Sequence, residues 1–194
     1  MTLIFDQDQD SHSFDDKQNS FVDMQNSALS VLNYLNESQL DVQFFSQSHS
    51  VLFNKKYSNY GILRSAILSS GLKSVEYKLS HLIQSYAHEI PTNSTVILFS
   101  ATTNNESDDL FKAFLKLEEN QCDVILISID QMAYAKNIFS KGELSDIDAH
   151  FYQKFSSRLK YDKTKRLFER IANRTYLLSP DKKLRDLYDQ SVGL

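Results

Sequence analysis

The sequence predicts an α/β fold: a doubly wound, mostly parallel six-stranded sheet with one antiparallel edge strand. Two apolar runs, at residues 95–100 and 123–130, read as central strands because they lack the alternation of strands with one wet face. Between them, after Ser107 and Asp108, five apolar residues recur at helical spacing: Leu110, Phe111, Phe114, Leu115 and Leu117. Two parallel strands joined by a right-handed helical crossover therefore form the centre of the fold.

The elements before this unit extend the sheet on one side. Residues 2–5 read as a buried strand that delivers Asp6 to its carboxyl end. A helix is predicted from Asp15 or Asp16 to Leu35, with acidic residues at its positive end. Residues 41–46 and 50–54 are separated by a turn so short that they must form an antiparallel hairpin.

The other elements are helices and one further strand. Helices are predicted at residues 62–68, from 74 to 86 or 88, and at residues 132–139, 147–159 and 163–172. Residues 175–178 give the last strand, and Pro180 is predicted to start a terminal helix over residues 181–189, because proline is favoured at a helix start.

Composition places the chain among ordinary globular proteins. Its 194 residues fit one domain, and a net charge of −4 points to no polyanionic partner such as nucleic acid. The single cysteine, Cys122, excludes an internal disulfide, and no apolar run is long enough to span a membrane. We therefore expect a soluble, cytoplasmic protein. Because residue 2 already begins a strand, we also expect the chain to be the C-terminal part of a longer protein.

The order of the elements resembles a von Willebrand factor A-like domain, a Rossmann-like fold. More narrowly, it resembles the C-terminal half of a bacterial family catalogued as domain of unknown function 58. The residues that carry the match are 3–6, 41–53, 60–66, 94–100 and 120–127. The resemblance covers nearly the whole chain, so residues 1–194 are expected to form a single domain of this kind.

Active domains of the von Willebrand class bind a divalent cation at the carboxyl edge of the sheet. Their ligands are an Asp-x-Ser-x-Ser loop, a threonine before a helix and an aspartate after the fourth strand. Asp6 matches the first ligand, whereas Asp8 and Asp10 stand where the two serines belong. Ser74 is the nearest stand-in for the threonine, and Ala101 follows Ser100 where the last aspartate belongs. The resemblance therefore implies a degenerate metal-ion-dependent adhesion site.

Alternatives stay open for the acidic residues. Asp6, Asp8 and Asp10 could bind Mg²⁺ or another divalent cation, since hard cations prefer carboxylate oxygens, with a partner's carboxylate completing the site. The plainer interpretation is a solvated acidic loop. A third is a metal-dependent phosphohydrolase resembling the haloacid dehalogenases, with Asp6 as nucleophile, Asp8 as general acid and Ser100 binding phosphate. That interpretation lacks an evident lysine or acidic pair to complete its site.

A basic stretch at residues 158–174 could contact phosphate groups. Asp162 and Glu169 interrupt it and the protein is acidic overall, which favours a solvated helix face or a protein-docking surface over nucleic acid binding.

The sequence thus predicts a non-enzymatic protein-interaction module with a degenerate metal site, and the alternative is the phosphohydrolase. The resemblance further implies a bacterial protein whose partner is a MoxR-type ATPase.

Overall fold

The computed structural model describes most of the predicted elements. The residues it describes are 1–8, 12, 20–53, 59–72, 78–101, 107–131, 133–134, 162, 166–167, 169–182 and 184. Candidate residues Asp10 and Ser74 lie outside this set, as do residues 147–159 and nearly all of 132–139, where helices were predicted.

Six strands form one sheet in the order β3-β2-β1-β4-β5-β6. They are β1 (Thr2–Phe5), β2 (Gln43–Ser46), β3 (Ser50–Val51), β4 (Thr95–Ala101), β5 (Asp123–Ile129) and β6 (Arg174–Leu178). Every pair is parallel except β2 with β3, which is antiparallel. The predicted doubly wound, mostly parallel sheet with one antiparallel edge strand is confirmed, and β4 and β5 lie inside it as expected.

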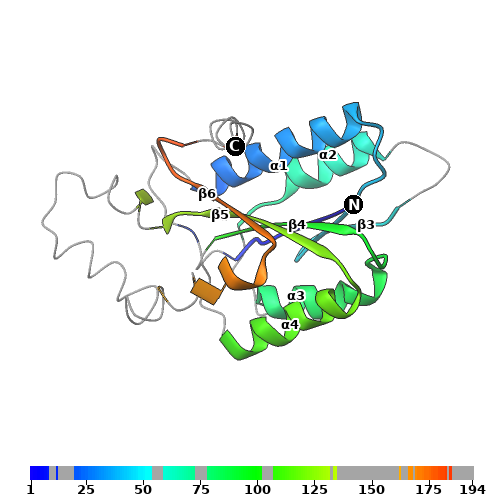
Figure 1. Cartoon of the computed structure of the whole chain (residues 1–194). Coiled ribbons are helices and arrows are strands. Elements are labelled where there is room, and N and C mark those ends of the chain that lie inside the picture. The colour runs from blue at the N-terminus through cyan, green and yellow to red at the C-terminus, as the bar shows by residue number, and fades with distance from the viewer. Residues whose placement is uncertain are drawn as a thin grey trace, which may run out of the picture.

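Helices cover both faces of the sheet. One face carries α1 (Ser20–Glu37) and α2 (Tyr60–Ser69), and the other carries α3 (Leu79–Tyr86) and α4 (Ser107–Glu119) (Figure 1). A 3-10 turn, η2 (Ala87–Glu89), ends α3. Within the described helices, none is long and apolar enough to cross a membrane.

The two faces divide the apolar residues of each strand by simple alternation. In β4, Ile97 packs on the α1 side and Leu98 on the α3 and α4 side. In β5, Ile127 and Leu126 divide in the same way. Successive side chains of a strand point to opposite faces, so an uninterrupted apolar run is what a sheet covered on both faces requires.

Two details of the sequence prediction are wrong. Phe111 and Leu115, expected on the inner face of α4, are 48% and 38% exposed, because the buried stripe instead runs through Leu110, Ala113, Phe114 and Leu117. Pro180 does not open a helix at residue 181: it lies in a tight turn that Ser179 and Lys182 close with reciprocal backbone hydrogen bonds.

Candidate functional site

Strand register brings three polar side chains to one point at the carboxyl edge of the sheet. Phe5 of β1 pairs with Ser46 of β2 and with Phe99 of β4. The next residue along each strand therefore lies side by side with the others, and these residues are Asp6, Gln47 and Ser100. The Asp6 amide continues the ladder by donating to the Phe99 carbonyl at 2.9 Å.

The Asp6 carboxylate is fully buried and is held by donors from three segments. Its Oδ1 accepts from the Gln47 side-chain amide at 2.8 Å and from the Asp8 backbone amide at 3.2 Å. Its Oδ2 accepts from the Ser100 hydroxyl at 2.9 Å. With 0% of Asp6 exposed, the carboxylate belongs to the interior of the protein.

The pKa of Asp6 is raised from 3.8 to about 6, chiefly because burial disfavours the charged form and secondly because of the neighbouring charge of Asp8. Hydrogen bonds from Gln47, Ser100 and the Asp8 amide act in the opposite direction, because they favour the charged form. The raised value shows that desolvation outweighs these donors. Asp6 therefore changes its protonation near pH 6, about two pH units above an exposed aspartate.

Ser100 can serve both protonation states of Asp6. Its hydroxyl lies 2.9 Å from Asp6 Oδ2 and 2.8 Å from the carbonyl oxygen of Ala101. When Asp6 is ionised, the hydroxyl can donate to the carboxylate. When Asp6 is protonated, the carboxyl can donate to Ser100, whose own proton then goes to Ala101, since a hydroxyl is both donor and acceptor.

Asp8 is the second buried carboxylate of the site and is 1% exposed. Lys78, directly before α3, reaches it from the α3 side of the sheet, and its Nζ lies 2.9 Å from Asp8 Oδ2. The lysine side chain keeps 34% of its surface exposed. The ion pair therefore joins a buried anion to a cation at the protein surface.

Gln7, between the two aspartates, fixes the loop that carries them. Its backbone amide donates to the side-chain oxygen of Gln47 at 2.9 Å, and its own side-chain amide donates to the Gly71 carbonyl at 2.9 Å. Its side-chain oxygen accepts from the Ser48 amide at 3.0 Å and from the Ser48 hydroxyl at 2.7 Å. The loop after β1 is thus tied to the β2–β3 turn and to the segment after α2.

The described residues of this edge do not fit a divalent-cation site. Protein donors occupy the oxygens of Asp6, and an ammonium group stands against Asp8, where it would repel a second cation. Ala101, buried at the end of β4, offers no side-chain ligand. No cluster of three or more His, Cys, Asp or Glu side chains suited to a metal occurs among the described residues.

The structure brings Asp6, Asp8 and Ser100 together, as predicted, but it corrects the interpretation of a solvated acidic loop for the two aspartates. Both are buried, because the loop turns inward onto the edge of the sheet. Gln47 lies in the predicted turn between residues 46 and 50 and was not predicted as a site residue. The pairing of Phe5 with Ser46 places it beside Asp6. Lys78 was missed because 70 residues separate it from Asp8 and no local pattern links the two.

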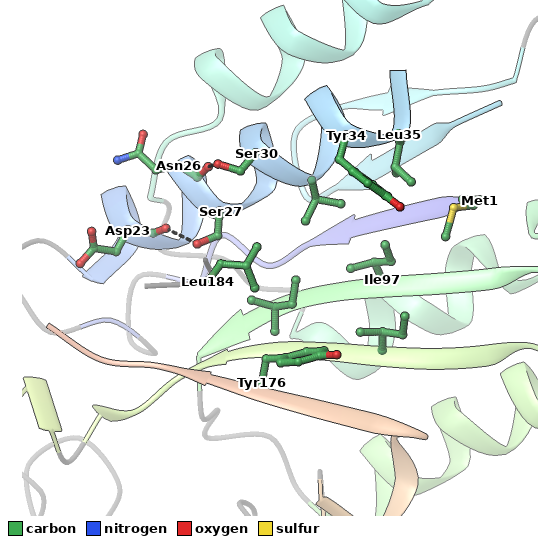
Figure 2. A pocket seen from close by; sticks show the side chains of 13 residues that line it. Met1, Asp23, Asn26, Ser27, Ser30, Tyr34, Leu35, Ile97, Tyr176 and Leu184 are labelled. Carbon is green, nitrogen blue, oxygen red and sulfur yellow. Dashed lines mark hydrogen bonds between the residues drawn. The ribbon is translucent and has the colours of Figure 1, made fainter. Parts of the chain in front are cut away.

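A cavity of about 770 Å³ lies elsewhere, between α1 and strands β4, β5 and β6. Tyr34 and Leu35 of α1 face Ile97 and Tyr176 of the sheet across it, as Figure 2 shows. Two lining serines of α1 bond within the helix: the Ser27 hydroxyl donates to the Asp23 carbonyl and the Ser30 hydroxyl to the Asn26 carbonyl. The carboxylate of Asp23, also in the lining, accepts a hydrogen bond from the Tyr134 hydroxyl. Among the described residues, the cavity therefore has mostly apolar walls with this one ionisable pair at its border.

Comparison with known proteins gives only a distant likeness. No protein-family model matches the sequence, and no curated protein matches it significantly. Two structures of proximal thread matrix protein 1 from the mussel byssus are similar, with 14% and 11% identity and TM-scores of 0.48 and 0.44. The second has zinc in its MIDAS motif. Each match covers 88% of this chain but 43% of the mussel protein, so the chain spans less than half the length of that protein. The fold class therefore rests on the topology of the sheet itself.

Proposed function

We propose that this chain is a non-enzymatic protein-interaction domain of the von Willebrand factor A-like class, and that its binding does not depend on a metal ion. The supporting observation is the burial of Asp6 and Asp8 at the carboxyl edge, with protein donors on their oxygens. A nucleophile or a metal ligand needs an oxygen that its target can approach. An edge whose carboxylates are buried and hydrogen-bonded is better suited to present a fixed surface than to carry out chemistry.

The proposed binding surface surrounds the buried Asp6 and Asp8. In open α/β sheets, ligands bind beyond the carboxyl ends of the strands, where neighbouring connections diverge. Here those ends carry the exposed part of Lys78, the β2–β3 turn and the exposed end of α2 at Ser69. The resemblance to the bacterial family suggests a MoxR-type ATPase as the partner and the cytoplasm as the location. The proposed partner rests on the resemblance alone.

Site-specific photo-crosslinking tests the proposal. A photoreactive amino acid at Ser69 should give a covalent adduct with one discrete protein in cells that express the chain. The same residue at Lys112, an exposed position on α4 on the opposite face of the sheet, should not. Adducts formed equally from both positions would contradict a binding surface at the carboxyl edge.

The phosphohydrolase remains the second candidate, because the structure supplies parts that the sequence alone did not. Ser100 contacts Asp6 from the adjacent strand, and Lys78 supplies a positive charge next to Asp8. Hydrolysis of an aryl phosphate in the presence of Mg²⁺ or Mn²⁺ tests it. We expect no turnover above the background of Asp6→Asn. Turnover that Asp6→Asn abolishes would replace the interaction proposal with an enzymatic one.

A further inference from the structure

Two carboxylates buried two residues apart create a problem of charge. Asp6 and Asp8 are 0% and 1% exposed, and the charge of Asp8 helps to raise the pKa of Asp6. Ionised carboxylates are costly to bury unless a positive group or strong donors compensate them. Asp6 is compensated by neutral donors, namely Gln47, Ser100 and a backbone amide. Asp8 instead has an ionic partner, Lys78, which contacts its Oδ2.

Lys78 has the geometry of a permanent counter-ion. Its ammonium lies 2.9 Å from Asp8 Oδ2, within the range of strong charge-assisted hydrogen bonds. Its position directly before α3, on the face toward which Asp6 and Asp8 turn, fixes the backbone that carries it. About two thirds of its side chain is buried, so the ion pair is partly shielded from solvent.

We propose that the ammonium of Lys78 takes the place that a divalent cation has in metal-binding domains of this architecture. The charge of Asp8 is then balanced from within the chain, Asp6 is held by neutral donors, and the folded shape of the edge requires no metal. Removal of the lysine charge, by mutation or by acetylation of this partly exposed amine, takes this counter-ion away from the buried Asp8. The folded edge should therefore lose stability. The inference concerns charge balance inside the domain, so it stands or falls independently of whether a partner protein binds.

A double-mutant cycle on Lys78 and Asp8 tests the inference through unfolding rather than partner binding. The variants are Lys78→Met, Asp8→Asn and the double variant, unfolded in urea with a chelator present. Loss of one partner of a buried ion pair should raise the unfolding equilibrium constant of Lys78→Met about 100-fold or more. The same lysine substitution should have an effect at least tenfold smaller once Asp8→Asn has removed the buried charge. Lys78→Arg, which keeps the charge, should remain close to the unsubstituted protein.

Two outcomes would overturn the proposal. One is an equal loss from Lys78→Met in both backgrounds, which would mean that the ammonium does not compensate Asp8. The other is stabilisation of the unsubstituted protein by Mg²⁺ or Ca²⁺ that disappears in Asp8→Asn, which would mean that a metal is the counter-ion. If Lys78→Met does not fold at all, the double variant decides: recovery of folding supports the proposal, and failure to recover overturns it.

Discussion

The carboxyl edge of the sheet and the cavity beside α1 differ in how closely they are packed and in how polar they are. At the edge, Asp6 and Asp8 are buried and bonded to groups from four different segments of the chain. At the cavity, Ile125 and Tyr176 border about 770 Å³ of space, the Ser27 and Ser30 hydroxyls bond within α1, and the Asp23 carboxylate accepts from the Tyr134 hydroxyl. The edge is therefore polar and closely packed, whereas the cavity is roomy and mostly apolar.

This difference separates two criteria that are often used together to find a functional site. Ionisable residues with shifted pKa values and a roomy apolar pocket usually coincide at an active site. Here they coincide only in part. The Asp6 edge is at the ends of β1 and β4, whereas the cavity lies over β4, β5 and β6 and has one ionisable pair at its border, Asp23 with Tyr134, in which burial and the Asp23 carboxylate raise the pKa of the tyrosine. The distance between the Asp6 edge and the cavity favours a structural role for Asp6 and Asp8, consistent with the proposal of a binding domain.

The largest expected effect compares the two faces of β5. Leu126 is fully buried on the α3 and α4 face, whereas Ile125, next to it, is half-buried and borders the cavity. Leu126→Ala should lower the free energy of unfolding by about 3 to 4 kcal/mol, and Ile125→Ala by about half as much, since it removes fewer packed contacts. Urea denaturation measures both. Equal losses would show that the cavity side is as tightly packed as the other face.

The second prediction concerns the pH dependence that Asp6 contributes. Because the folded pKa is about 6 and the ordinary value is 3.8, the folded state binds more protons than the unfolded state between these values. The contribution of Asp6 to stability therefore falls as pH rises from about 4 to about 6, by on the order of 3 kcal/mol, and is constant above that range.

Asp6→Asn should remove this fall, since an amide has no charge to desolvate and can still accept from Gln47 and donate to Ser100. The measurement is the difference between the two proteins in the free energy of unfolding, followed across this pH range, which cancels the other carboxylates. A difference that does not vary with pH would contradict the raised pKa.

Ser100→Ala should have an intermediate effect. It removes one of the donors that favour the ionised form of Asp6, so the pKa of Asp6 should rise further. Loss of a hydrogen bond to a buried carboxylate should cost about 1.5 to 2 kcal/mol at neutral pH, and less in acid, where Asp6 is protonated. Ser128→Ala, which alters the equivalent position on β5, is the matched control. An equal cost at both pH values would show that Ser100 acts through packing alone.

The smallest expected effect tests the space beside α1. Val31→Ile adds one methylene at the cavity wall and should stabilise the protein by up to about 0.8 kcal/mol. The same addition at Val96, fully buried on the opposite face, should destabilise it by about 1 kcal/mol, because no space is left there. Thermal denaturation compares them. Destabilisation by both would contradict the existence of usable space at the cavity.

Much of the fold could be predicted because its signals are local. The uninterrupted runs of β4 and β5 predict strands covered on both faces, and the short link between β2 and β3 permits only a hairpin. The sequence does not show which side of α4 faces the core, since Phe111 and Leu115 are as apolar as their buried neighbours. Only packing against α3 decides which stripe is buried, and that depends on an element distant in the sequence.

Part of the site could be predicted from the sequence, and the contributions of Gln47 and Lys78 could not, for a similar reason. Asp6 follows one recognisable strand and Ser100 lies near the end of another, so adjacency of β1 and β4 brings them together. The contribution of Gln47 depends on exact register, and that of Lys78 depends on where α3 begins. These long-range partners determine whether an acidic loop is solvated or buried. The composition of the loop therefore indicated a solvated loop, whereas the structure shows that Asp6 and Asp8 are buried.

The most direct test of the central claim is isothermal titration calorimetry of the unsubstituted protein with Mg²⁺, Mn²⁺ and Ca²⁺. If Lys78 and the neutral donors already satisfy Asp8 and Asp6, none of the three ions should give a saturable heat of binding. A saturable heat that is lost in Asp6→Ala would show that a metal binds at this edge, and that the internal counter-ion does not take its place.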